Sequence, residues 1–462
     1  MTDEKVIDLS KRENGQNKCP KCGATDVSFS SKKGKLVCNF CRHQFELEKV
    51  DNMEGNVSEL VGNVIGTGAK QIDIDSDDMM TLECTSCGAE VVIDTAKAAQ
   101  ARCHWCRNTL SINEQVPNGA VPDVVLPFNV TKESAEEKIK EFVNKRKFYA
   151  NDVFKKEFTT ENITGVYFPY FIVDVNATAK LNGEAEIETR KYTITVDDRE
   201  ETRYEADCYD VERTFDIEID NLTVESSKDK LNKKCKTKTT NIINAIMPFD
   251  IENCVKWDAN YIKGYNSEKR DADTSSLDGL VNAQSLDIAK IRALETMSQY
   301  DRGVFWKRKD IDVKGKKWIA SYLPVWLYSY MEKKGGDNNI LHYVAVNART
   351  LETMGSVPIN KVKLIIVSII LAIVAFFVGL FIDLDWITYV LPFVAGGGYY
   401  YYIYSTYRND GARHNHELET KSIVKNMQEV DNFKENRKKL RNSKIQGENS
   451  RSINDYEFNN ED

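Results

Sequence analysis

Residues 19–41 of this chain, CPKCGATDVSFSSKKGKLVCNFC, begin and end with a C-x-x-C pair. Fifteen residues separate the two pairs, which is the spacing of a four-cysteine zinc ribbon. Two residues between thiolates allow one tight turn to present both sulfurs to a single ion. A second turn of this kind completes a tetrahedron with Zn–S distances of about 2.3 Å. We therefore predict a small β zinc ribbon over residues 17–49.

The same spacing occurs again 65 residues further on, in residues 84–106, CTSCGAEVVIDTAKAAQARCHWC. A disulfide framework would need an oxidising compartment, and the N-terminal residues contain no apolar signal segment. A redox C-x-x-C needs one pair that opens a helix, whereas each pair here has a matched second pair. Because four thiolates close each site, we predict a second ribbon over residues 82–115 and two structural Zn²⁺ ions. The predicted ligands are Cys19, Cys22, Cys38, Cys41, Cys84, Cys87, Cys103 and Cys106.

The segments beside the ribbons are polar. Residues 1–16 predict a flexible N-terminus, and residues 50–81 predict a linker. Within this linker, residues 61–70 (VGNVIGTGAK) are similar to a phosphate-binding loop but contain no Gly-Lys-Ser/Thr. His43 and His104 stand beside predicted ligands. We expect both on the ribbon surface, because four thiolates already satisfy each ion.

Residues 121–358 predict a folded α+β domain. Thr131 can cap a helix in which Ala135, Ile139, Phe142 and Val143 recur at helical spacing. A second amphipathic helix is predicted over residues 277–300. Alternating or β-branched, aromatic segments predict strands over residues 165–179, 214–224, 317–330 and 340–346.

Two short similarities indicate that this domain has two related halves. LPF (126–128) precedes the first helix and YFPYF (167–171) opens the strand after it; MPF (247–249) and YLPVW (322–326) take the same places around the second helix. We find no catalytic constellation in the domain. Its single histidine, His342, stands in a predicted strand, where a hydrogen-bonded structural role is more common than catalysis.

Two apolar segments near the C-terminus are long enough to span a membrane. Residues 364–382 and 387–407 contain no charged residue, although Pro392 and the glycines at 396–398 weaken the second helix. Lysine and arginine flank both outer ends, and the turn between them carries only two aspartates. By the positive-inside rule we predict a two-helix transmembrane hairpin in the cell membrane with both termini cytoplasmic. Residues 408–462 predict a charged cytoplasmic tail.

The charge of the chain argues against a nucleic-acid clamp. The formal net charge is −8, from 63 basic and 71 acidic residues. Residues 17–49 carry seven basic and three acidic residues, and a zinc–tetrathiolate centre offsets about two of the four excess positive charges. Phosphate recognition usually requires more. A protein partner is therefore the favoured interpretation, and a membrane-attached nucleic-acid binder is the alternative.

Several segments resemble a known family of bacterial membrane proteins that contain a TFIIB-type zinc ribbon. The resemblance rests on residues 84–95 (CTSCGAEVVIDT), 101–108 (ARCHWCRN), 117–123 (PNGAVPD), 323–330 (LPVWLYSY) and 345–350 (AVNART). It implies zinc ribbons, a middle domain and C-terminal membrane helices, and it implies no reaction. Together, the residues and the resemblance predict a non-enzymatic, membrane-anchored zinc protein that acts as an adaptor at the inner face of the membrane.

Overall fold

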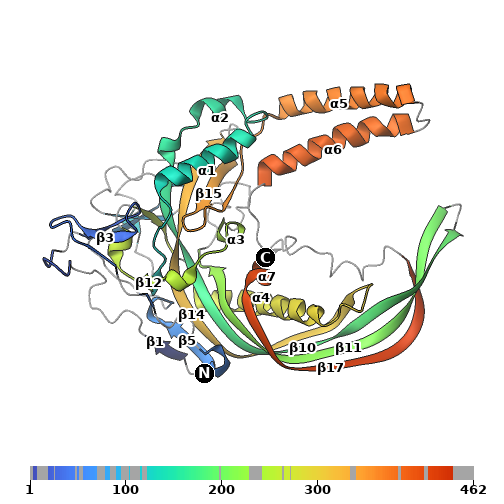
Figure 1. Cartoon of the computed structure of the whole chain (residues 1–462), viewed down its shortest axis with the longest axis horizontal. Helices are drawn as coiled ribbons and strands as arrows, with labels where there is room; N and C mark the ends of the chain where they lie inside the picture. The colour runs from blue at the N-terminus through green and yellow to red at the C-terminus, as the bar shows by residue number, and fades with distance from the viewer. Residues whose placement is uncertain are drawn as a thin grey trace.

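The computed structural model describes residues 4–7, 19–24, 27–46, 49–50, 56–69, 79–83, 90–94, 103–104, 115–116, 122–196, 199–227, 242–262, 265–270, 272–332, 340–382, 387–409 and 415–440. Within these residues, 14 strands form one large sheet and three form a small one. Figure 1 shows a body from which a curved group of strands and a pair of helices project in the same direction.

Four long strands dominate the large sheet. β10 (Thr164–Val196) pairs antiparallel with both β11 (Arg199–Glu225) and β14 (Val304–Glu332), and β17 (Lys421–Leu440) pairs antiparallel with β11. Their distal parts, residues 177–196, 199–217, 304–313 and 424–440, extend away from the body, and we call them the arm (Figure 1). The predicted strands were correct in type but too short, because the arm is rich in charge and lacks the apolar composition of a typical strand.

The same order of elements occurs twice around the centre of the sheet. β9 (Val124–Val125) and α1 (Lys132–Lys145) precede β10, while β13 (Asn266–Glu268) and α4 (Thr274–Glu295) precede β14. Each short strand pairs in parallel with the long strand of the other set, β9 with β14 and β13 with β10. The two similar segments at 167–171 and 322–326 lie side by side, with Phe168 opposite Leu323.

Both helices follow from their sequence patterns. The Thr131 side chain caps α1 by accepting a hydrogen bond from the Ser134 N–H, and all four predicted apolar residues of α1 are buried. α4 packs its buried residues, among them Val281 and Ile288, into the cluster formed by the arm strands. In Figure 1, α4 lies against the concave side of these strands.

The shorter elements complete the body. The remaining strands are β1 (Glu4–Ile7), β2 (Val27–Ser30), β3 (Lys35–Cys38), β4 (Gln44–Phe45), β5 (Gly62–Gly66), β6 (Met79–Glu83), β7 (Glu90–Asp94), β8 (Gln115–Val116), β12 (Val255–Lys256), β15 (Ile340–Asn347) and β16 (Thr353–Gly355). The remaining helices are α2 (Asp152–Glu157), α3 (Ile242–Ala245), α5 (Lys361–Ile382), α6 (Ile387–Asn409) and α7 (His416–Glu419).

Two segments predicted to be flexible form strands instead. β1, in the predicted flexible N-terminus, pairs in parallel with β5, and β5, in the predicted linker, pairs in parallel with β14. The glycine-rich loop after β5 is held by the buried Asp123 carboxylate, which accepts hydrogen bonds from the N–H groups of Gly68 at 2.6 Å and Ala320 at 2.8 Å. A Cβ atom on Gly66 would lie 2.2 Å from this carboxylate. The glycines therefore serve the close approach of Asp123 rather than a phosphate.

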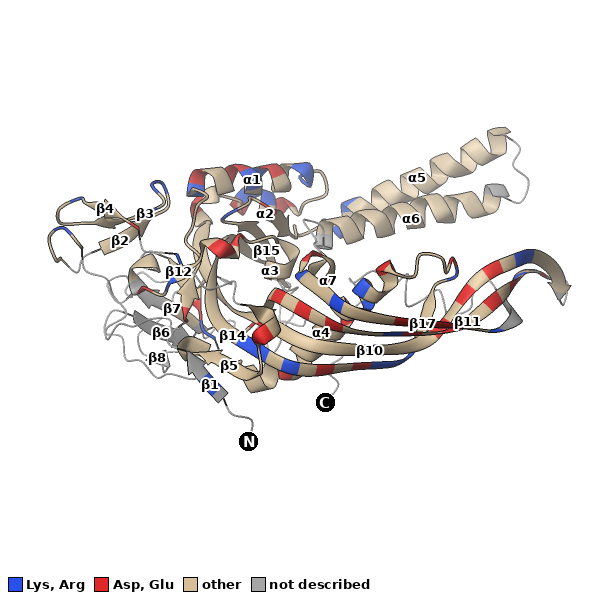
Figure 2. Ribbon diagram, turned by 60° about the horizontal axis from the view of Figure 1, so that its bottom comes forward, with Lys and Arg blue, Asp and Glu red and all other residues tan. Residues whose placement is uncertain are grey.

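The predicted charged tail also contains a strand. β17 was missed because 14 of its 20 residues are polar. Its pairing with β11 is supported by ion pairs, above all between the fully buried Arg213 and Asp431, with Nη1 and Oδ1 2.6 Å apart. Figure 2 shows acidic and basic residues distributed along β11 and β17. Complementary charges on neighbouring strands add to the apolar contacts that Val424 and Met427 make with the cluster of the arm strands.

The helices α5 and α6 pack against each other as a helical hairpin, residues 361–409 (Figure 1). At their contact, a Cβ on Gly396 would lie 2.8 Å from the Ser368 carbonyl oxygen and 3.0 Å from the Ala372 Cβ. Of the helices that the structure describes, only α5 is long and apolar enough to cross a membrane. Of the two predicted membrane-spanning helices, α5 meets this criterion and α6 does not, because its tyrosines and Pro392 make it less apolar.

Candidate metal centre

The first ribbon brings its four cysteines together. β2, β3 and β4 form the three-stranded small sheet, in which β3 pairs antiparallel with both neighbours. The Sγ atoms of Cys19, Cys22, Cys38 and Cys41 all lie within 4.8 Å of one another. Cys19 and Cys41 are separated by 3.6 Å, as are Cys22 and Cys38. A tetrahedral zinc–thiolate centre requires sulfurs about 3.8 Å apart, so this group could hold a metal ion.

Each cysteine pair stands on a tight turn. In the first turn the Gly23 N–H donates to the Cys19 carbonyl oxygen, and Gly23 has a φ of 73°. In the second turn the Arg42 N–H donates to the Cys38 carbonyl oxygen, and Arg42 has a φ of 61°. Gly23 directly follows the second cysteine of its pair, and glycine adopts a positive φ without steric cost. The same backbone form at Arg42 shows that the geometry belongs to the turn and not to glycine.

The local environment favours thiolate at one of these positions. Burial raises the pKa of the Cys19 thiol, but hydrogen bonds from the backbone of Cys22 and Lys21 and from neighbouring thiols outweigh it and lower this pKa to about 7. Since thiolate is the metal-binding form of cysteine, the turn prepares Cys19 for a cation. Four sulfur ligands leave no open position, which is the arrangement of a structural site.

The first ribbon is not a separate domain. Its buried residues Cys19, Val27 and Phe29 belong to the same core cluster as α1 and the centre of β10 and β14. The rings of Phe29 and Tyr261 are 5.2 Å apart, and the Lys32 ammonium pairs with Glu133 at 3.0 Å. The ribbon is therefore held against the body, and the full chain is the appropriate unit for experiments.

The second cysteine set is described only in part. Cys103 is buried and belongs to the main core cluster, whereas Cys84, Cys87 and Cys106 lie outside the described residues. β6 ends directly before Cys84, and β7, which begins after Cys87, pairs with it antiparallel, so that Glu83 lies opposite Glu90. The strands thus bring together the two ends of the segment that contains the first cysteine pair.

The prediction that His104 lies on the ribbon surface is wrong. Its side chain is buried, with the ring 6.2 Å from that of Phe168 and Nε2 3.8 Å from a Glu268 carboxylate oxygen. The Ser329 hydroxyl donates to the His104 carbonyl oxygen. The second cysteine region packs against the main sheet, so residues beside its ligands enter the core. His43 is half-buried and stacks on Phe45, with ring centroids 6.1 Å apart.

One exposed residue of the first ribbon had no sequence signal of its own. Phe40, between Cys38 and Cys41, is 80% exposed. A single exposed aromatic ring is ordinary on a protein surface, but aromatic side chains are also the residues that most often anchor a protein interface. The two inner positions of a C-x-x-C pair accept any residue type. Only the large side chain of Phe40 could therefore have marked it in the sequence.

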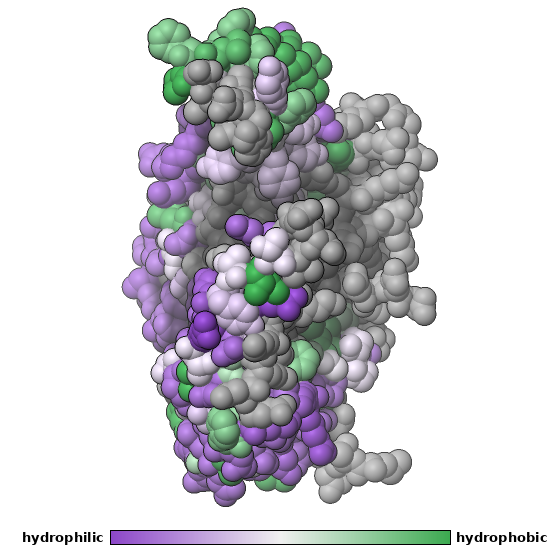
Figure 3. All heavy atoms as spheres, turned by 90° about the vertical axis from the view of Figure 1, so that its right-hand side faces the viewer, coloured by the Kyte–Doolittle hydropathy of each residue, from purple (hydrophilic) through white to green (hydrophobic). Residues whose placement is uncertain are grey.

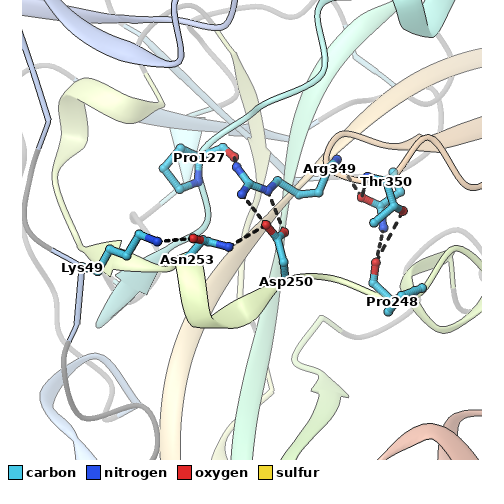
Figure 4. A network of polar contacts seen from close by, with 8 residues as sticks. Lys49, Pro127, Pro248, Asp250, Asn253, Arg349 and Thr350 are labelled. Atoms are coloured by element: carbon cyan, nitrogen blue, oxygen red, sulfur yellow. Dashed lines mark hydrogen bonds and ion pairs between the residues drawn. The ribbon is translucent and has the colours of Figure 1, made fainter.

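Several segments that carry the family resemblance serve the core. Arg349 forms a two-pronged ion pair with Asp250 and donates to the Pro127 carbonyl oxygen at 3.0 Å (Figure 4). Asp250 also accepts from Asn253, which in turn accepts from Lys49 at the end of the first ribbon. This network connects the ribbon to the segments that precede α1 and α4, and it is a structural centre.

His342 also has partners on both ring nitrogens. Nδ1 lies 3.1 Å from the Ser356 hydroxyl, and Nε2 lies 3.4 Å from a Glu332 carboxylate oxygen. All three residues belong to or adjoin β14, β15 and β16, and the imidazole is buried. This is the environment of the hydrogen-bonded structural histidine that the sequence predicts.

No family model, curated protein or solved structure matches this chain. The site is therefore interpreted from its own geometry.

Proposed function

We propose that this protein is a membrane-attached zinc protein whose cytoplasmic part is a non-enzymatic module for binding a protein partner. The observation that carries the proposal is the closed four-sulfur group of the first ribbon in the same chain as the apolar helix α5. A metal ion that only stabilises the fold leaves the surrounding protein surface available to bind a partner. The resemblance to the zinc-ribbon membrane proteins is consistent with this role.

The proposed metal is Zn²⁺, with one ion at each cysteine set. Thiolate ligands favour zinc over the hard cations, and the matched spacing of residues 84–106 supports a second ion. A ribbon of about 30 residues buries little core without its metal. Loss of the ion should therefore loosen the first ribbon first.

The proposed membrane attachment is a hairpin that crosses the bilayer twice. β17 follows α6, yet it pairs with β11, which precedes α5. A sheet of charged strands cannot straddle a bilayer, so the number of crossings must be even. A single crossing by α5 conflicts with this pairing, whereas two crossings, or none, agree with it. The length and composition of α5 favour two.

The proposed side is the cytoplasm. Lys361 and Lys363 lie in the first turn of α5, and Arg408 follows the apolar part of α6, whereas the turn between the helices carries no lysine or arginine. Free thiols, including the buried Cys208 and Cys254, are also stable in a reducing compartment.

Protein binding is favoured over nucleic-acid binding by the first ribbon's surface. Lys32 and Lys35 are engaged in ion pairs with Glu133 and Glu46. The pairs are exposed and weak, but the two carboxylates beside these lysines lower the positive potential that the ribbon presents to phosphate. The exposed Phe40 instead fits the aromatic anchor of a protein interface.

The first experiment is zinc analysis of the purified full chain in detergent. We expect two ions per chain and one in Cys22→Ser. A wild-type content of one or none would contradict the second or both proposed sites.

The second experiment compares proteins captured with the wild type, with Phe40→Ala and with Val61→Ala, a control on a residue that is equally exposed at 80%. We expect one partner to be lost only from Phe40→Ala. Sub-micromolar binding of DNA or RNA that weakens steeply with salt would favour the nucleic-acid alternative instead.

A further inference from the structure

The junction between α1 and α2 presents exposed apolar side chains beside the helical hairpin. Phe148 is 59% exposed and Val153 is 55% exposed, although the neighbouring Tyr149 and Phe154 are buried. Residues 145–156 form what we call the corner. A single exposed apolar residue is ordinary, but two on one corner next to a membrane helix form a surface that water does not favour.

Hydrogen bonds fix the corner to the base of the hairpin. The hydroxyl groups of Tyr149 and Tyr399 are 2.7 Å apart, and the Asn360 N–H donates to the Tyr149 carbonyl oxygen at 2.8 Å. The Lys363 ammonium donates to the Phe148 carbonyl oxygen at 2.8 Å and lies 3.9 Å from the centre of the Phe148 ring. A bilayer that receives α5 therefore meets the corner at the first turn of that helix.

The corner is strongly basic. Residues 145–156 (KRKFYANDVFKK) contain five basic residues and one acidic residue, a net charge of +4. Arg146 is buried, with its guanidinium 3.6 Å from the centre of the Phe142 ring, so it is not available to a ligand. Lys145 and Lys155 form exposed pairs with Glu141 and Asp152, which are weak enough to exchange partners. Lys147 and Lys156 are exposed.

We propose that the corner is a second membrane contact, in which Phe148 and Val153 enter the headgroup region and Lys147 and Lys156 bind anionic lipid phosphates. Apolar side chains flanked by lysines are the chemistry that anionic membrane surfaces recognise. The proposal rests on the membrane attachment of α5. It adds a contact that fixes the body against the bilayer, so that the ribbons and the arm keep a defined orientation.

The experiment is amide hydrogen exchange of the full-length protein in lipid nanodiscs. One set contains phosphatidylcholine alone, and the other contains phosphatidylcholine with phosphatidylglycerol. We expect slower exchange of residues 145–157 in the anionic nanodiscs than in the neutral ones. The double variant Lys147→Glu/Lys156→Glu should lose this difference, whereas Lys180→Glu/Lys191→Glu, with two exposed lysines on the arm, should keep it.

The exchange of α5 separates this proposal from the membrane attachment itself. Protection of α5 together with identical exchange of the corner in both lipids would overturn the corner contact alone. Protection of the corner that is insensitive to lipid charge and to the lysine variant would also overturn it, and would indicate a contact with protein. Rapid exchange of α5 in both lipids would overturn the membrane attachment and the corner contact together.

Discussion

The helical hairpin and the arm are both long projections from the same body, but they are built for opposite surroundings. The hairpin exposes apolar side chains on nearly every side of α5, and small residues allow its two helices to approach closely. The arm exposes charged residues and connects its strands by ion pairs, such as Lys434 with Glu184 at 3.0 Å. Figure 3 shows the apolar hairpin at the top and the hydrophilic arm at the bottom of the same face.

This difference determines how the molecule can meet a membrane. The hairpin and the arm point in the same direction (Figure 1). If the two helices crossed a bilayer parallel to its normal, the arm would enter the bilayer as well. Charged side chains are excluded from the hydrocarbon core. We therefore infer that, in the proposed attachment, the hairpin is tilted from the bilayer normal in the direction that keeps the arm in water. The two projections differ in composition. The same substitution should therefore be damaging in the hairpin and tolerated in the arm.

The largest effect is expected from a lysine placed on each projection. Ile370, near the middle of α5, is 55% exposed, and Val430, on β17, is 46% exposed. Ile370→Lys should oppose membrane insertion by about 3–4 kcal/mol, whereas Val430→Lys should change stability by less than about 0.5 kcal/mol. The measurement is the fraction of the full-length protein that resists alkaline extraction from membranes. Equal extraction of the two variants would remove the proposed distinction.

The next effect concerns the attachment of β17 to the arm. Arg213 donates to both carboxylate oxygens of Asp431 and to the Thr296 hydroxyl, so Arg213→Ala removes these hydrogen bonds and leaves Asp431 with the Tyr300 hydroxyl as donor. Asp431 keeps partial access to water, and we expect a loss of about 2–3 kcal/mol. Thermal unfolding and proteolysis within residues 421–440 report it. Arg308→Ala, which removes an exposed pair with Asp310, is the control and should cost less than about 1 kcal/mol.

A third effect distinguishes tight from loose glycines within the hairpin. A side chain at Gly396 would meet the Ser368 carbonyl and Ala372, whereas at Gly397 nothing lies within 4 Å. Gly396→Val should separate the helices at a cost of about 1–2 kcal/mol, and Gly397→Val should be tolerated. The comparison is the thermal stability of both variants in the same detergent. If Gly397→Val were the more damaging, the packing of α5 on α6 would have to be revised.

The smallest effect is a pH dependence at the base of β17. Burial lowers the pKa of His416 from 6.5 to about 4. The His416 imidazole is therefore protonated below about pH 6.5 in the unfolded chain but only below about pH 4 in the folded chain. The free energy of unfolding consequently falls as the pH decreases through this window. Between pH 7 and pH 5.5 we expect a loss of about 1 kcal/mol, measured by denaturant unfolding. His416→Asn should lack this part of the dependence, and an unchanged pH profile in that variant would exclude the histidine as its source.

Sequence patterns predicted the parts of this protein whose chemistry is local. The spacing of Cys19, Cys22, Cys38 and Cys41 predicts a four-sulfur group that could hold a metal ion, and the run of apolar residues predicts that α5 is long and apolar enough to cross a membrane. Neither prediction needs a distant contact. Helix α1 likewise follows from its cap at Thr131 and its apolar stripe.

The parts that were missed depend on partners far away in the chain. β5 was taken for a linker because its glycines look flexible, yet they allow a close approach to Asp123 and to β14. β17 lies in the predicted charged tail, and its partners are residues of β11, about 200 residues earlier in the chain. The burial of His104 similarly follows from the packing of its segment on the main sheet. Neither β5 nor β17 carries the apolar alternation that predicted the strand over residues 214–224 of β11.

The most direct test of the account is the accessibility of two introduced cysteines in intact cells. One is Leu384→Cys, between the helices of the hairpin, and the other is Phe433→Cys, which replaces an exposed residue of β17. We expect an impermeant thiol reagent to label the first without lysis and the second only after lysis, because a hairpin that crosses twice returns the chain to the side of the sheet. Labelling of Leu384→Cys only after lysis would contradict the two crossings, and labelling of Phe433→Cys in intact cells would contradict the common side of β17 and β11.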